Sequence, residues 1–367
     1  MTMEIQSDLP TADRFRGLSQ NNLFWFLEGV EPKKLEHNII QRKLNFGSVF
    51  AETLGSGATG KMNEDSLAIL PMGMGRTLVA AFDGASSQKK IGCLSAEGIS
   101  GAFYLSKLIS LGFEKTYEYK RLCQTEDLTA KGVMVFMNKW IRGNLEKVEG
   151  IDYNDTPSVP GMAAAFLLID VPKGKLTISQ VADTMVALVG ANGDVKVITP
   201  NLNEKFDKET MDYALYLART YNTDLCHFKK IPEANELFHA HLLESFTRKT
   251  NKEGGCGIMN GMPEMNSNGL IYSTQIPMND GVSSVMLFSD GAILPYTGSN
   301  ISYEASVKLL AKTAKEPNIL SPLKIGASIL DCDPNFMNTP RLKHCDDATI
   351  ALVNLDYKGI ESLPLAG

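Results

Sequence analysis

Acidic residues lie at both ends of a predicted β-hairpin. Glu64 and Asp65 precede a short apolar run at 66–70, and Asp83 follows a second apolar run at 77–82. If the two runs pair as antiparallel strands, Glu64 and Asp65 lie beside Asp83. Two carboxylates in contact repel each other by about 4 kcal/mol at the effective dielectric of a protein surface, so such a cluster needs protons or cations. A single Asp-Gly step after a strand, however, is also an ordinary turn signal.

The same arrangement recurs twice further along the chain. The apolar segment 284–289 ends at Asp290, which a glycine follows, and Asp346 and Asp347 directly precede an apolar strand predicted at 348–355. Three acidic strand ends indicate one carboxylate cluster rather than three unrelated turns. Carboxylate oxygens suit hard cations, so we expect Mg²⁺ or Mn²⁺ and not zinc. No histidine of the sequence falls inside an acidic motif, which argues against a histidine-rich metallohydrolase.

Four short motifs, in this order, resemble those of the metal-dependent type 2C serine/threonine protein phosphatases. They are Asn63-Glu64-Asp65, Phe82-Asp83-Gly84, Ser289-Asp290-Gly291 and Asp346-Asp347-Ala348-Thr349-Ile350. The resemblance runs from about residue 46 to residue 355 and depends on the order and strand context of the motifs. It implies a divergent family member that hydrolyses phosphoserine and phosphothreonine in proteins, by attack of a metal-activated water and without a covalent intermediate.

The resemblance also implies a role for each residue of the cluster. Asp83, Asp290 and Asp346 would be the catalytic carboxylates that hold two Mg²⁺ or Mn²⁺ ions. Asp83 would bridge both ions, Asp290 and Asp346 would complete the ligands of one, and Gly84 would offer its carbonyl oxygen to the other.

Three further acids receive roles from the resemblance. Glu64 would ligate an ion directly, and Asp65 would hold a water on the metal. Asp183 stands where the family has another acidic residue that helps to bind a third ion. An aspartate in a hairpin turn explains Asp183 equally well.

Some positions depart from the family pattern. Gly60 stands where relatives usually carry an arginine that grips the substrate phosphate, and Lys61 follows it. Lysine supplies charge without the planar fork of arginine. Lys61 is therefore our candidate for binding substrate phosphate, with a solvated loop lysine as an equal alternative. Ala85 and Met185 replace residues that are often His and Arg in relatives.

Three functions are compatible with these residues. The first is a Mg²⁺- or Mn²⁺-dependent phosphoprotein phosphatase, and the second is a catalytically weak phosphatase fold that serves as a regulatory or binding module. A phosphatase of a small phosphorylated metabolite is the third. Because a binding module has no need to keep like charges crowded together, the retained carboxylates favour the enzyme.

The composition of the chain limits its expected cellular location and the classes of partner that it could bind. The 367 residues are 44% hydrophobic, which is enough for a substantial core. A net charge of −6 and a pI near 5.5 give no reason to expect nucleic acid or an anionic membrane as a partner. The six cysteines are scattered, which favours reduced thiols and a cytoplasmic location. The amino-terminal residues predict no signal peptide, and the longest apolar run, 162–171, is about half a membrane span.

The order of predicted elements indicates an α+β fold. We expect an extension at 1–45 that packs on the core or binds a protein partner, a phosphatase-like domain at 46–356 and a tail at 357–367. The pattern argues against a parallel doubly wound sheet. It consists of paired helices at 90–113 and 128–148, a meander of strands at 161–198, and a helical insertion at about 203–254. The resemblance implies a four-layer α-β-β-α sandwich, with two mainly antiparallel central sheets flanked by helices and the insertion as a flap.

Overall fold

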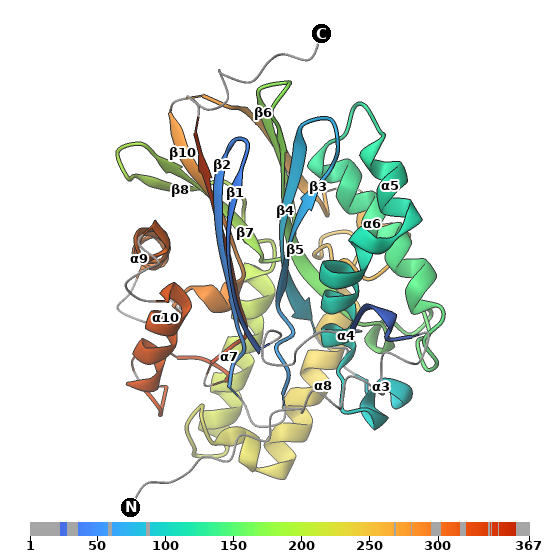
Figure 1. Ribbon diagram of the computed structural model, residues 1–367. Helices are drawn as coiled ribbons and strands as arrows, with labels where there is room; N and C mark the ends of the chain where they lie inside the picture. Colours follow the sequence, from blue (N-terminus) through green and yellow to red (C-terminus); the bar gives the residue numbers. More distant parts are fainter. Residues whose placement is uncertain are drawn as a thin grey trace, which may run out of the picture.

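Two antiparallel β-sheets pack face to face in the computed structural model, and helices cover the outer face of each (Figure 1). The structure describes residues 23–27, 36–57, 61–85, 89–267, 269–279, 281–294, 302–315, 321–336, 338, 340–343 and 345–356. This arrangement confirms the predicted four-layer α-β-β-α sandwich. No helix in the described ranges is both long enough and apolar enough to cross a membrane.

The first sheet has five strands in the order β3-β4-β5-β6-β9. Its strands are β3 (Ser66–Pro71), β4 (Arg76–Ala85), β5 (Gly161–Asp170), β6 (Lys175–Val181) and β9 (Tyr272–Pro277). All ten residues of β5 are buried, as expected for a central strand with both faces covered.

The second sheet has six strands in the order β1-β2-β11-β10-β7-β8. Its strands are β1 (His37–Leu44), β2 (Gly47–Leu54), β7 (Met185–Gly190), β8 (Val195–Val197), β10 (Val282–Phe288) and β11 (Ala348–Leu355). Strand β1 pairs with β2 along its whole length, from His37 opposite Leu54 to Leu44 opposite Gly47. The sheet therefore begins before the expected domain start at residue 46, which falls between two paired strands.

The expected meander at 161–198 is divided between the two sheets. Strands β5 and β6 pair in the first sheet, whereas β7 and β8 pair in the second. The chain crosses from one sheet to the other at 182–184, where Ala182 has a positive φ of 58°. The four strands predicted at 161–198 are confirmed, but the local pattern does not indicate which of them share a sheet.

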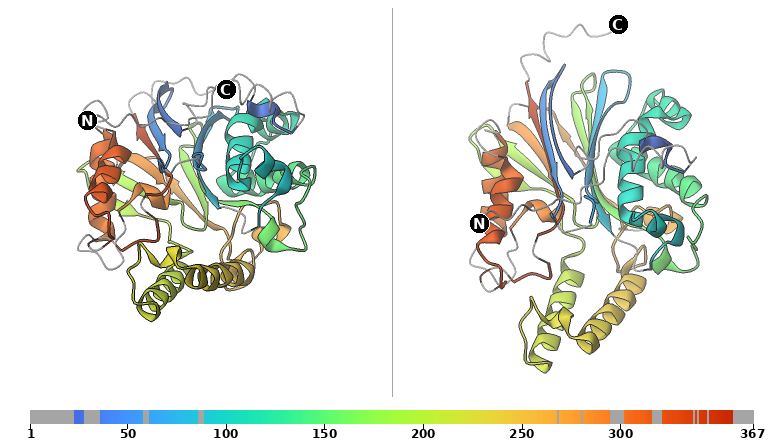
Figure 2. Two further views of the ribbon diagram at one scale, coloured as in Figure 1. Left: turned by 90° about the horizontal axis from the view of Figure 1, so that it is seen from below. Right: turned by 60° about the horizontal axis from the view of Figure 1, so that its bottom comes forward.

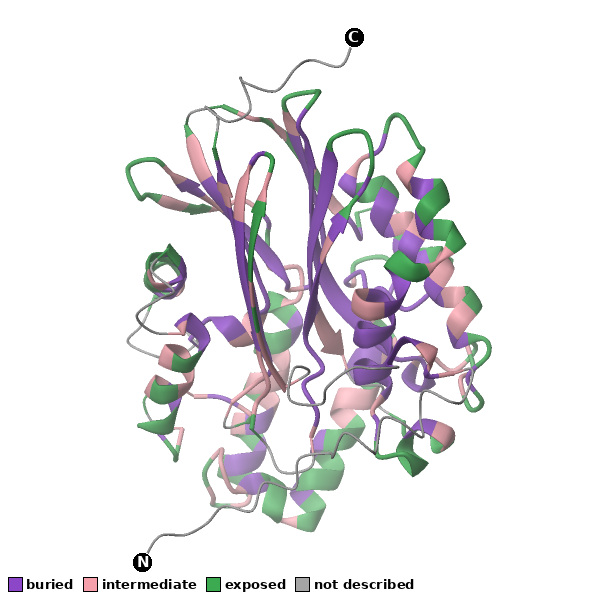
Figure 3. Cartoon of the chain, viewed as in Figure 1, coloured by how far each residue is buried: buried purple, intermediate pink, exposed green. Residues whose placement is uncertain are grey.

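Apolar side chains fill the space between the sheets. The central strands of both sheets are coloured mostly as buried in Figure 3. Val79 and Leu167 of the first sheet belong to the same buried cluster as Val285 and Val353 of the second. A second apolar layer lies between the first sheet and its helices, and a third between the second sheet and its helices.

The helices of the first outer layer are more broken than expected. They are α3 (Gly92–Ala96), α4 (Gly101–Lys107), α5 (Tyr117–Cys123) and α6 (Ala130–Leu145). The predicted helix at 90–113 is interrupted because Gly98 has a φ of 67°, after which Ser100 caps the start of α4. Short segments complete this side of the fold: η1 (Trp25–Leu27), η2 (Leu108–Gly112), η3 (Phe113–Lys115), η4 (Thr156–Ser158) and η6 (Pro263–Asn266).

The second outer layer consists of α9 (Tyr303–Lys315) and α10 (Pro322–Asp331), and η7 (Asp290–Ala292) follows β10. On the opposite side of the molecule, Phe26 and Leu27 of the predicted extension are buried in the core beneath the first helical layer. The packing interpretation of the segment around Trp25 is therefore correct. Residues 1–22 and 357–367 lie outside the described residues.

The predicted helical insertion is a pair of antiparallel helices that projects from one end of the sandwich (Figure 2). It contains α7 (Glu204–Thr220), η5 (Phe228–Lys230) and α8 (Pro232–Lys249). We call this pair the flap. Its own core is small, with six buried residues: Ala214, Leu217, Ala218, Phe228, Ala234 and Phe238.

Candidate active site

The predicted acidic residues meet in one cleft of about 300 Å³ at the end of the sandwich where the flap begins. The structure brings together Lys61, Glu64, Asp83, Gly84, Asp183, Asp290 and Asp346 in its lining. Asp65 is buried directly beneath them, at 1% exposure. The acids come from strand ends of both sheets, so the sandwich itself positions them.

The β3–β4 hairpin places Asp65 beside Asp83, as the sequence predicted. The ladder pairs Ser66 with Phe82, so the next residues along the two strands are Asp65 and Asp83. A side chain at Gly84 would lie 2.7 Å from the carbonyl oxygen of Glu64. Glycine is required there because the backbone of the acidic turn approaches so closely.

A second close approach joins Asp290 to Asp346. Strands β10 and β11 pair Phe288 with Ile350, and both acids follow from that register at the same sheet end. A side chain at Gly291 would lie 2.0 Å from the carbonyl oxygen of Asp347. Both Asp-Gly steps therefore allow two acidic segments to touch, and neither is a simple hairpin turn.

Asp183 lies at the crossing from β6 to β7 and reaches the cleft from there. The hairpin-turn interpretation of this residue is wrong, because β6 and β7 belong to different sheets. Its carboxylate accepts a hydrogen bond of 2.9 Å from Asn203 at the start of the flap. Burial raises the pKa of Asp183, while Asn203 and Lys249 oppose that rise.

The carboxyl groups of the cleft crowd one another. Asp83 and Asp290 lie in hydrogen-bonding contact. Burial raises the pKa of Asp83 well above its usual value, and Asp65, Asp290, Asp183 and Asp346 raise it further. Two carboxylates in such contact cannot both be ionised without a cation or a shared proton.

The donor atoms fit hard cations. One carboxylate oxygen of Asp65, Oδ2, is buried without a hydrogen-bond partner. Among the described residues that line the cleft, none is histidine or cysteine. In the described part of the chain, the one group of three ligating side chains within 4.8 Å of one another lies elsewhere, in the flap. Binding of an ion in the cleft would therefore draw the carboxylates closer together around it.

Asp347 holds the loops of the site together, a role that sequence reasoning missed. Its carboxylate accepts hydrogen bonds from Ser56 N (2.8 Å), Glu64 N (2.9 Å) and Lys61 Nζ (2.9 Å). Burial alone would raise its pKa, but Lys61 and these amides outweigh burial and hold the pKa below the usual value. The adjacent acids Asp346 and Asp347 thus differ: one lines the cleft, and the other is a buried anchor.

Lys61 and Glu64 also bond to each other at the edge of the cleft. Lys61 Nζ lies 3.2 Å from Glu64 Oε2, and Ser100 donates a hydrogen bond of 2.5 Å to Glu64 Oε1. Lys61 therefore lines the cleft but carries two carboxylate partners, Glu64 and Asp347. The side chain is 33% exposed, so it is partly solvated as well as ion-paired, and its role in binding phosphate stays a prediction.

Two more lysines line the cleft that the sequence analysis did not single out. Lys343 pairs with Asp346, and Lys249 donates a hydrogen bond of 2.8 Å to Asn203 Oδ1. Lys343 stands three residues before Asp346, a candidate metal ligand, and this spacing is a pattern from which the pair could have been predicted. Lys249 comes from the end of α8, and no local pattern connects it with the strand ends.

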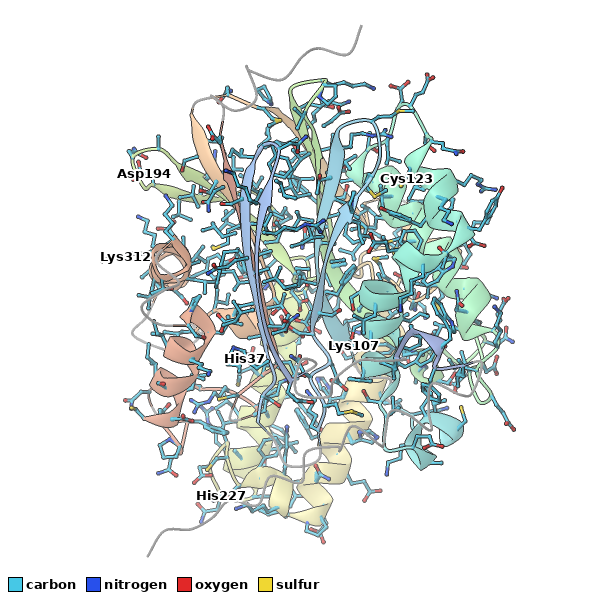
Figure 4. All side chains as sticks on the ribbon, viewed as in Figure 1. His37, Lys107, Cys123, Asp194, His227 and Lys312 are labelled. Carbon is cyan, nitrogen blue, oxygen red and sulfur yellow. The ribbon has the colours of Figure 1, made fainter. Side chains whose placement is uncertain are left out.

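A buried lysine lies behind the acidic turn. Lys107, at the end of α4 and labelled in Figure 4, is 3% exposed, and its ammonium donates a hydrogen bond to the backbone carbonyl of Asp65. Burial lowers the pKa of Lys107 to about 8, against the opposite effect of Asp65, Asp347 and Glu36. The helical pattern of 90–113 gave no indication that this lysine points inward.

No family model matches the sequence, and no curated protein matches it either. Among solved structures, the serine/threonine phosphatase Stp1 from Staphylococcus aureus is 12% identical, with 86% of this chain and 98% of that chain covered and a TM-score of 0.47. The serine/threonine phosphatase PstP/Ppp of Mycobacterium tuberculosis is 17% identical, with 84% and 98% covered and a TM-score of 0.42. These likenesses are too distant to indicate a function, which is argued from the cleft.

Proposed function

We propose that this protein is a Mg²⁺- or Mn²⁺-dependent phosphatase that hydrolyses phosphoserine and phosphothreonine in proteins. One observation carries the proposal: aspartates from four separate strand ends line one cleft, and two of them, Asp83 and Asp290, are in contact. Folding has concentrated negative charge where it costs stability, which is typical of a catalytic cation site. The six cysteines form no disulfide, and we place the protein in the cytoplasm.

The acidic residues of the site are the proposed cation ligands. We assign Asp83, Gly84, Asp290 and Asp346 to two ions and Asp183 to a third. Glu64 and Asp65 complete the set from the acidic turn. When bound, such ions lower the pKa of water and neutralise charge on a transferred phosphoryl group.

The lysines of the cleft provide the means to bind phosphate. Lys249 and Lys343 stand on different segments of the lining, where Lys249 bonds to Asn203 and Lys343 pairs with Asp346. Both place positive charge at the cleft, which favours a phosphate ligand there. Lys61 adds charge on the side of the acidic turn. The wall between these groups includes Ala163, Phe246 and Ile258, against which the carbon chain of a phosphorylated residue can pack.

Two substrates test the proposal. The purified chain should hydrolyse an aryl phosphate and a phosphothreonine peptide when Mn²⁺ or Mg²⁺ is added, and a chelator should abolish both activities. Asp83→Asn serves as the matched inactive variant. Activity that survives exhaustive chelation, or no activity with any divalent ion, contradicts the proposal. Hydrolysis of small sugar phosphates, without action on the peptide, would instead identify a metabolite phosphatase.

A second function, that of a cation-binding regulatory module, has one observation in its favour. The expected phosphate-binding residue, Lys61, is already engaged by Glu64 and Asp347. This alternative predicts that Mn²⁺ raises the melting temperature of the protein while no phosphate ester is hydrolysed. Binding and turnover measured on the same sample therefore separate the two functions.

A further inference from the structure

A compact group of three different ligating side chains lies in the turn between α7 and α8, at the outer end of the flap. Asp224, Cys226 and His227 offer atoms that all lie within 4.8 Å of one another. Asp224 Oδ1 lies 2.8 Å from His227 Nδ1, the Cys226 thiol donates to Asp224 Oδ1 at 3.0 Å, and Cys226 Sγ lies 3.2 Å from His227 Nδ1. Carboxylate, thiol and imidazole thus face one common point.

This geometry excludes a Cys-His-Asp nucleophile. In such a triad the carboxylate and the nucleophile bond to different ring nitrogens of the histidine. Here both partners face Nδ1, and Nε2 is farther from the sulfur, at 3.8 Å. Burial and the nearby Asp224 also raise the pKa of Cys226, which is the opposite of what activates a thiol.

We propose that this turn binds one zinc ion through Asp224, Cys226 and Nδ1 of His227. Thiolate, imidazole and carboxylate are the ligands that zinc prefers, with bonds of about 2.0 to 2.3 Å. The edges of a zinc tetrahedron built on those bonds are about 3.3 to 3.5 Å long. The three separations in the turn are shorter by a few tenths of an ångström, so a small outward movement of the side chains is sufficient. Binding releases the thiol proton to solvent, the proton on Nδ1 of His227 is released or moves by way of solvent to Nε2, and water takes the fourth position.

The backbone presents the three ligands in advance of any ion. The amides of His227 and Phe228 both donate to the carbonyl of Asp224, at 3.2 and 3.1 Å, which closes the turn. Phe228 is fully buried in the small core of the flap and Leu225 packs against it, so both ends of the turn are anchored. Pre-organisation of this kind lowers the cost of binding.

An ion in this turn would also stabilise the connection between the two helices of the flap. Its core contains six buried residues, which is few for a pair of helices that projects from the domain. Small units with little core are commonly stabilised by a structural metal. Lys229, two residues after His227, donates to the carbonyl of Leu342 at 3.0 Å, so the turn contacts the segment that carries Lys343.

Figure 4 labels His227 at the outer tip of the flap, away from the two sheets, so this site is distinct from the acidic cleft. The difference in ligands allows an independent test, because no cysteine is among the described residues that line the cleft. A thiolate-to-metal signal that depends on Cys226 therefore reports the flap site whether or not the protein is a phosphatase.

The test is titration of the full-length, reduced protein with Co²⁺, followed by displacement with Zn²⁺. We expect a thiolate-to-cobalt charge-transfer band in the near ultraviolet that saturates at one equivalent and disappears when zinc is added. Cys226→Ser should abolish the band, and His227→Ala should weaken zinc binding by about tenfold or more. Cys332→Ser, at an exposed cysteine elsewhere, is the matched control and should keep the band.

Circular dichroism of each variant verifies that the flap helices remain folded. Absence of the band in the wild-type protein overturns the proposal, and so does a band that persists in Cys226→Ser. Loss of the band in Cys332→Ser as well as in Cys226→Ser would assign the thiolate to a different place and also reject the flap site.

Discussion

Neighbouring acids in the cleft have opposite electrostatic environments. Burial and like charges raise the pKa of Asp83 and of Asp290, whereas Lys61 and backbone amides lower the pKa of Asp347 against the effect of its burial. The contact between Asp83 and Asp290 is unfavourable without a cation, whereas the charge of Asp347 is already neutralised by its partners. The neighbours of each aspartate, and not its own charge, therefore separate the residues that need a cation from the residue that organises the loops.

Asp83→Asn should change stability and metal binding in opposite directions. Without metal, Asp83 only adds repulsion, so the substitution should raise the free energy of unfolding by about 1 to 3 kcal/mol. With metal, its loss removes the proposed bridging ligand, so turnover should fall by orders of magnitude. Melting curves with and without Mn²⁺ measure both effects. An Mn²⁺-induced shift as large as that of the wild-type protein would reject the bridging role.

The metal-free protein should lose stability as the pH rises. Asp65, Asp83, Asp183, Asp290 and Asp346 all have a raised pKa in the folded state. Their unfolded pKa is about 3.9, so their favourable contribution is complete below that pH and is lost as the pH rises through the folded values.

We therefore expect the melting temperature in chelator to decrease as the pH rises above the unfolded pKa of about 3.9, and saturating Mn²⁺ to flatten that dependence. Asp347 acts in the opposite sense, since its lowered pKa stabilises the fold above the unfolded value. Parallel pH profiles with and without Mn²⁺ would show that the cluster does not bind the ion.

Lys107 should be important for stability mainly when metal is absent. Its buried ammonium lies near Asp65, Asp347 and Glu36, so Lys107→Met leaves these acids without that charge. Removing one partner from a buried charged network costs about 3 kcal/mol. Mn²⁺ should recover part of the loss by supplying positive charge to the same cluster. Lys139→Met, at an exposed position of α6, is the control. Equal losses with and without Mn²⁺ would show that Lys107 acts through packing alone.

At the scale of elements, the positions of the strands were predicted better than the pairing of strands within the sheets. The apolar runs at 66–70 and 77–82 became β3 and β4, and the register expected from their hairpin placed Asp65 beside Asp83. That prediction succeeded because a hairpin is a local structure. The break at Gly98 and the crossing at Ala182 were missed, since both depend on a positive φ that helical or strand periodicity does not reveal.

Gly291→Ala should disturb the contact between η7 and β11. A Cβ atom there would lie 2.0 Å from the backbone oxygen of Asp347, so one of the two acidic segments must move. We expect a loss of about 2 kcal/mol in stability, and a weaker Mn²⁺-induced shift because Asp290 and Asp346 are displaced together. Thermal melting with and without Mn²⁺ measures both.

Gly143→Ala is the matched control for that substitution. Gly143 lies in α6 with nothing within 4 Å of its missing side chain, so alanine should stabilise the helix by about 1 kcal/mol. If Gly291→Ala were as well tolerated as Gly143→Ala, the close approach of the two acidic segments would not be needed for the site.

At the scale of the whole molecule, the cleft combines segments from both sheets and from the flap. The acids could be predicted because each follows or precedes a strand with a clear pattern. Lys249 and Asn203 could not, because they reach the cleft only through the way the flap sits on the sandwich. Tertiary contacts between segments that are far apart in the chain produce no local pattern in a single sequence.

The flap should control which phosphorylated substrates reach the cleft. Asn203 and Lys249 belong to the cleft itself, whereas the outer parts of α7 and α8 project beyond it (Figure 2). Replacing residues 208–244 by a flexible Gly-Ser linker keeps both cleft residues and removes the projecting surface. Activity on an aryl phosphate should then change less than about threefold, while activity on a phosphoprotein should fall or rise by about tenfold or more, because only the larger substrate can touch the flap. The ratio of kcat/KM for the two substrates measures this selectivity. Equal changes on both substrates would mean that the flap only supports the cleft.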